Sequence, residues 1–96
     1  MNINALEEIR QNLRRTRNQG VGRQQAEAYI QMASKLRRIL ETEQEQQQQL
    51  KRLANMAYEV RDSNLAVSLE DTARRMNQEL DILDDIVRQA RAIANN

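Results

Sequence analysis

The stretch "VRDSNLAVSLED", residues 60–71, decides whether most of this chain is one long helix or two helices that fold back on each other. Before it, apolar residues recur at spacings that alternate between four and three, which is typical of a helix that packs along one seam. This seam consists of Tyr29, Ala33, Leu36, Leu40, Glu43, Gln47, Leu50, Ala54 and Ala57, and it is widened by Met32, Ile39, Leu53 and Val60. Continued in the same register, it would meet only polar residues, namely Arg61, Asn64, Ser68 and Asp71.

A second seam with the same spacing begins inside this stretch. Its members are Leu69, Ala73, Met76, Leu80, Leu83, Val87, Ala90 and Ala94. Because the two registers do not join, we predict a turn within residues 61–68 and an antiparallel pairing of the two helices. The alternative is an uninterrupted helix with a stutter in its repeat, since the stretch contains neither Gly nor Pro.

A shorter helix precedes the two long ones. Its apolar residues recur at helical spacing and are Ile3, Leu6, Ile9 and Leu13. Asn4 with Glu7 three residues later resembles a capping box, which marks a helix start. The segment "NQGVGRQ", residues 18–24, ends this helix, because Gly20 and Gly22 tolerate the backbone conformations that close helices.

The fold class expected from these patterns is all-α. We expect a short N-terminal helix packed on a long antiparallel helical hairpin, with coiled-coil-like seams, in a single domain over residues 1–96. The expected helices cover about residues 4–18, 23–61 and 65–94. Because the first linker is short, the first helix should fold back along the second, with Ile9 near Met32 and Leu13 near Ala28.

The composition argues against an enzyme. The chain has 96 residues and contains no Cys or His, which removes the commonest nucleophile–base pairs and metal ligands. We therefore expect no catalytic residues, no cofactor and no metal site. The start, "MNINALEEIRQN", lacks the apolar segment of a secretory signal, and no apolar run approaches the roughly 20 residues that span a membrane. We expect a cytoplasmic protein that does not act in a membrane.

The charges are distributed unevenly along the chain. Residues 1–40 hold eight basic and three acidic side chains, whereas residues 41–96 hold seven basic and eleven acidic ones. The candidates for binding an anion are Arg10, Arg14, Arg17, Arg23 and Tyr29. Three interpretations stay open: pairing with the acidic half, within the chain or between copies; contact with an acidic partner helix; or phosphate binding. Nucleic acid is disfavoured, because the net charge is +1 and there are only two aromatic residues.

Two features predict an interface. A second apolar row flanks the seam of the third helix, and a hairpin alone would cover only one of these two rows. Two polar residues on the seam of the second helix, Glu43 and Gln47, imply either a solvated gap or a face that another copy completes. The interface candidates are Leu65, Ile82, Ile86, Ile93, Glu43 and Gln47.

The function expected from the sequence is a non-enzymatic helical interaction module, such as a chaperone or adaptor. It would form a homo-oligomer or bind a helical protein partner through the apolar faces of the second and third helices. The first alternative is an oligomeric protein that binds a small anionic ligand, such as a nucleotide, through its arginines. A weak nucleic-acid binder is the second alternative.

Overall fold

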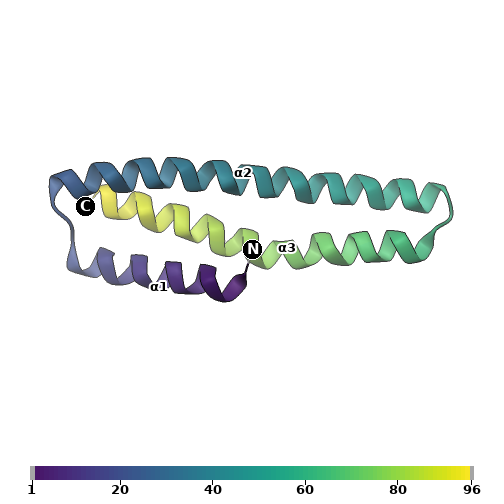
Figure 1. Cartoon of the computed structure of the whole chain (residues 1–96), viewed down its shortest axis with the longest axis horizontal. Helices are drawn as coiled ribbons and strands as arrows, with labels where there is room; N and C mark the ends of the chain where they lie inside the picture. Colours follow the sequence, from purple (N-terminus) through teal and green to yellow (C-terminus); the bar gives the residue numbers. More distant parts are fainter. Residues whose placement is uncertain (1, 96) are drawn as a thin grey trace.

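The computed structural model describes residues 2–95, which form three helices and no strand. The helices are α1 (Ile3–Gln19), α2 (Arg23–Glu59) and α3 (Ser63–Asn95) (Figure 1). The predicted all-α fold, a short N-terminal helix packed on a long antiparallel hairpin, is confirmed. The molecule is long and flat, with extents of 58 × 20 × 14 Å.

A turn at residues 60–62 separates the two long helices, so the alternative of an uninterrupted helix is wrong. The Asp62 N–H donates to the Ala57 carbonyl at 2.9 Å, and the Arg61 N–H donates to the Tyr58 carbonyl at 3.0 Å. This pair of hydrogen bonds is a Schellman motif, which requires a left-handed residue after the helix. Arg61 takes that conformation with φ of 61°, although glycine is the usual residue there.

The same turn begins the next helix. The Asp62 carboxylate accepts a hydrogen bond from the Leu65 N–H at 3.1 Å, and this bond satisfies one of the free N–H groups of the first turn. For this reason α3 begins at Ser63, two residues before the expected position.

The start of α1 corrects another expectation. The Asn2 side chain accepts a hydrogen bond from the Asn4 N–H at 2.9 Å, so Asn2 is the cap and the predicted capping box at Asn4 is wrong. Glu7 therefore lies inside the helix, where it pairs with Arg10 one turn later. At the other end, Gly20 closes the helix with a positive φ of 79°, as its residue type predicts.

The position of α1 differs from the expectation. It packs against α3 and does not contact α2, so the expected pairs Ile9–Met32 and Leu13–Ala28 do not form. Figure 1 shows α3 between the two other helices, with α1 beside only the C-terminal half of α3. Because the chain reverses direction twice, α1 runs parallel to α3.

Burial on two sides of α3 explains this arrangement. Leu80 and Ile82 are both buried although they lie about 160° apart around the helix. One side packs on α2, and the other, which carries Ile82, Ile86 and Ile93, packs beneath α1. The expectation that these three isoleucines lack cover within the chain is therefore wrong. Leu65, which lies beyond the reach of α1, is 48% exposed.

The structure predicts that this second row is essential for stability. Replacing Ile86, which is fully buried, by Ala should lower the free energy of unfolding by about 2–4 kcal/mol, because it leaves a cavity under α1. The matched control is Ile30→Ala, because Ile30 is 53% exposed on α2 and its loss should change stability by less than about 1 kcal/mol. Urea unfolding followed by circular dichroism measures both. Equal effects of the two substitutions would contradict the placement of α1.

Candidate interaction surfaces

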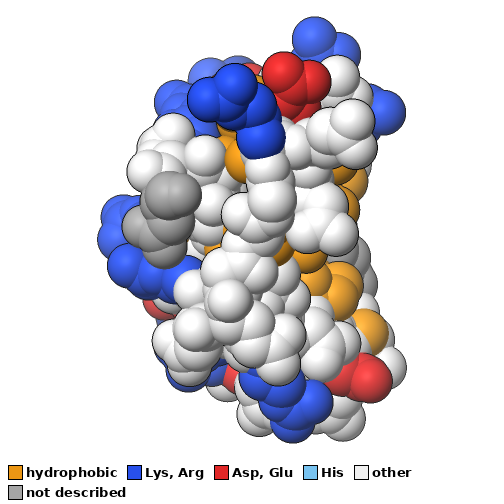
Figure 2. Space-filling model, turned by 90° about the vertical axis from the view of Figure 1, so that its left-hand side faces the viewer, with side chains coloured by type: hydrophobic (Ala, Val, Ile, Leu, Met, Phe, Trp, Pro, Cys, Tyr) orange, Lys and Arg blue, Asp and Glu red, His pale blue; other side chains and the backbone are white. Residues whose placement is uncertain are grey.

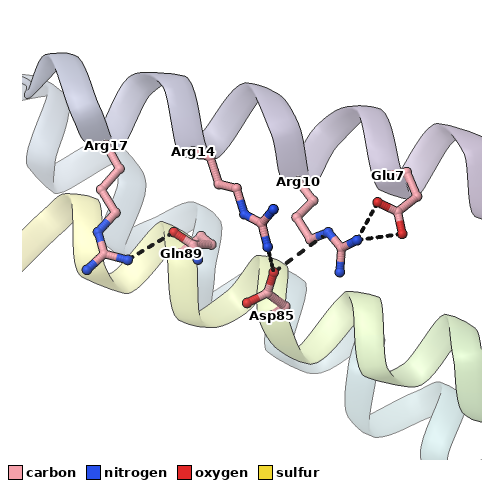
Figure 3. Close-up of polar contacts among 6 residues, drawn as sticks. All are labelled: Glu7, Arg10, Arg14, Arg17, Asp85 and Gln89. Carbon is pink, nitrogen blue, oxygen red and sulfur yellow. Dashed lines mark hydrogen bonds and ion pairs between the residues drawn. The ribbon is translucent and has the colours of Figure 1, made fainter.

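Three arginines of α1 reach toward α3 (Figure 3). The Asp85 Oδ2 atom lies 3.8 Å from Arg10 Nε and 3.6 Å from Arg14 Nη2, so one carboxylate faces two guanidinium groups. One helical turn further along each helix, Arg17 donates to the Gln89 side-chain oxygen at 3.2 Å. These contacts join the basic first part of the chain to the acidic second part.

The positions of these arginines follow from the repeat of α1. The residues of α1 that face α3 are spaced by three and four and are Ile3, Leu6, Arg10, Leu13 and Arg17. Arg10 thus occupies an inner position between the buried Leu6 and Leu13. Its Nε atom and the Asp85 Oδ2 atom are both buried, and at 3.8 Å they attract each other without a hydrogen bond. A charged group at such a position requires a counter-charge, which Asp85 provides.

The five residues predicted to bind an anion are placed as follows. Arg10, Arg14 and Arg17 are engaged by Asp85 and Gln89 within the chain. Arg23 is exposed at the first residue of α2, and Tyr29 is half-buried against the hydrophobic core. Of the interpretations that the sequence leaves open, pairing with the acidic half within the chain is the one that these contacts match.

The polar position on the α2 seam is satisfied inside the hairpin. Gln47 is buried, and its Nε2 atom donates to the Ala73 carbonyl at 2.8 Å and to the Asn77 side-chain oxygen. An unpaired amide at this place would destabilise the fold, so these bonds allow Gln47 to be buried. The predicted solvated gap is therefore absent at Gln47, and neighbouring Glu43 is half-buried.

The end of the hairpin has its own polar link between helices. A hydrogen bond to the Glu70 side chain raises the pKa of Tyr58 above its ordinary value of 10.0, with further contributions from burial and from the charges of Glu70 and Asp71. The hydrogen bond favours the neutral phenol. It connects the last turn of α2 to the first part of α3.

The separation of α1 from α2 leaves an apolar groove on α2. Its lining residues are Ala28, Gln31, Met32, Lys35, Leu36 and Ile39. Met32 and Ile39 are 43% and 41% exposed, which leaves a large part of two apolar side chains in water. Figure 2, which looks along the molecule from the end that holds the α1–α2 connection, shows apolar side chains gathered along one side.

Ile9 of α1 is exposed on the same side of the molecule as this groove, although the groove itself is lined by α2 alone. Arg14 contacts Asp85, which lies on the side of α3 away from α2, because Asp85 is about 200° around the helix from the buried Leu83. Ile9 lies about 140° around α1 from Arg14, on the flank turned toward α2, and it is 43% exposed. Ile9 and the groove of α2 thus lie on the same side of α3.

Exposed apolar residues continue along α2 beyond the groove. Two of them, Leu53 and the C-cap residue Val60, share one position of the seven-residue repeat with Met32 and Ile39, and we call these four residues together the apolar row of α2. Its members are Met32, Ile39, Leu53 and Val60. The sequence predicts these residues as a widening of the apolar face. Met32 and Ile39 are exposed because α1 packs on α3, whereas Leu53 and Val60 lie beyond the length of α1.

No protein-family model matches this chain, and comparisons with curated proteins and with solved structures find no significant similarity. Within residues 2–95, none of the helices has a stretch apolar and long enough to cross a bilayer.

The ion cluster predicts a stability effect of one carboxylate. Asp85→Asn should lower the free energy of unfolding by about 1–2 kcal/mol, because two arginines, one of them largely buried, lose their counter-charge. Asp81→Asn is the matched control, because Asp81 is exposed on the same helix. Its substitution should change the free energy of unfolding by less than about 0.5 kcal/mol. Thermal and urea unfolding of both variants would check this. If Asp85→Asn behaves like Asp81→Asn, the cluster contributes nothing to the attachment of α1.

Proposed function

We propose that this chain is a non-enzymatic helical interaction module that associates with a helical protein surface through the apolar row of α2. The observation that carries the proposal is the exposure of this row, of which Met32 and Ile39 line an open groove on α2. Isolated exposed apolar residues are common on soluble proteins, but an aligned row of them marks an interface.

The proposed surface differs from the one expected from sequence. The α3 row with Ile82, Ile86 and Ile93 is already covered by α1. The half of α3 beside α1 is therefore buried on two sides and offers little apolar surface to a partner. The surface that remains belongs to α2, with a contribution from Ile9 of α1.

The shape of this surface favours a helix as the partner. Successive members of the apolar row are seven residues or a multiple of seven apart, so they form a row that winds slowly around α2, by about 20° for every seven residues. An amphipathic helix that lies in the groove beside α2 can place its own apolar side chains between them. The charged residues near the groove, such as Lys35, would remain at its rim in contact with water.

The arginines of α1 support the anion-binding alternative less well. Arg10 and Arg14 face Asp85 closely enough that an incoming phosphate would have to compete with that carboxylate. The same pairing reduces the positive charge available to a nucleic acid. The interaction module is therefore the function that we propose first.

A charge placed in the apolar row tests the proposal. Leu53→Glu should lower the fraction of associated protein at least tenfold, because association would bury an unpaired carboxylate. Asn55→Glu is the matched control, because Asn55 is exposed two residues along α2 on the opposite side, and it should leave association unchanged. Native mass spectrometry of both variants, purified gently from cells, measures this, and their circular dichroism must match that of the unmodified chain.

Two results would contradict the proposed function. If the unmodified chain carries neither a second copy nor another helical chain, the proposed function is wrong. It is also wrong if Leu53→Glu and Asn55→Glu have the same effect on association.

A further inference from the structure

The spacing of the apolar row of α2 is symmetric about one residue, Gln46. Ile39 and Leu53 each lie seven residues from Gln46, and Met32 and Val60 each lie fourteen residues from it. Gln46 occupies the same position of the repeat and is exposed. In an interface with two-fold symmetry, residue i of one copy meets residue j of the other, and j meets i. A row that is symmetric about its central residue satisfies this condition.

The charges of α2 favour an antiparallel arrangement of two copies. Residues 23–40 of this helix hold four basic side chains and one acidic side chain, whereas residues 41–59 hold two basic and four acidic ones. Antiparallel packing of α2 on a second α2 places the basic half of each copy beside the acidic half of the other. Parallel packing would place like charges together, which is unfavourable.

The shape of the molecule fits the same arrangement. The contacts of Arg10 with Asp85 and of Arg17 with Gln89 keep α1 along the C-terminal half of α3, at the end of the molecule that holds the N-terminal half of α2. The other half of the hairpin, with Leu53 and Val60, has no third helix beside it (Figure 1). In an antiparallel pair, this uncovered half of one copy lies along the groove on α2 of the other.

We propose that the occupant of the apolar row is a second copy of this chain, in an antiparallel dimer whose two-fold axis passes near Gln46. Ile39 of each copy then faces Leu53 of the other, and Met32 faces Val60. The inference rests on the proposed function and specifies its partner. It also gives the polar segment of residues 41–49 a role, because two Gln46 amides at the axis can donate to and accept from each other.

A single cysteine tests the position of the axis. The chain contains no Cys, so Gln46→Cys introduces one thiol at an exposed site that contributes nothing to the core. A residue at the axis meets its own copy, at the separation that a disulfide requires. Mild oxidation should therefore give a covalent dimer in high yield, seen as a doubled intact mass without reductant.

The matched control is Gln48→Cys. Gln48 is also exposed, but it lies about 160° around α2 from Gln46 and faces away from the proposed partner. Its disulfide-linked dimer should form at least tenfold more slowly at the same protein concentration. Sedimentation equilibrium of the reduced variants establishes whether each remains a dimer without the covalent bond.

The results that would contradict the dimer differ from those that would contradict the proposed function. A reduced chain that is monomeric at tens of micromolar would overturn the second copy as the occupant. The proposed function would survive that result if a different helical chain accompanies the protein and is lost in Leu53→Glu. A dimer that cross-links equally through Gln48→Cys would overturn the arrangement about Gln46.

Discussion

The two-sided burial of α3 is the constraint on which the arrangement of the other helices depends. Leu80 and Ile82 lie too far apart around α3 for one neighbouring helix to cover both, yet both are buried. α2 covers one side and α1 the other, so the central helix separates the two outer ones. The groove beside Met32 and Ile39 is a direct consequence, because the helix that could have covered them is used elsewhere.

The attachment of α1 combines apolar and charged contacts. Leu6 and Leu13 are buried, but the inner position between them is Arg10, which cannot be buried without a counter-charge. Asp85 supplies this charge from α3, against which α1 packs. An α1 placed on α2 would leave Asp85 without Arg10 and Arg14, so the ion cluster favours one position of α1 over the other.

Much of the fold was predictable, because the periodicity of the two long seams reports directly on helix packing. The turn at residues 60–62 was also signalled by the break in register, although Arg61 gives no glycine-like cue for its left-handed backbone. The side on which α1 packs was not predictable, since the short linker permits either neighbour and both α2 and α3 offer it apolar rows. The ion cluster was missed for the same reason: Asp85 and Arg10 are neighbours only after α1 has been placed.

Adjacent residues in the polar segment of α2 face different surroundings. Gln47 faces α3, where its amide donates hydrogen bonds to the Ala73 carbonyl and the Asn77 side-chain oxygen. These bonds hold the register of the hairpin. Gln46, about 100° around the helix, faces outward at the centre of the apolar row. An apolar residue there would make the exposed row continuous and allow partners to bind in shifted registers. A polar residue at the centre, with apolar residues seven and fourteen positions to either side, favours one register over the shifted ones.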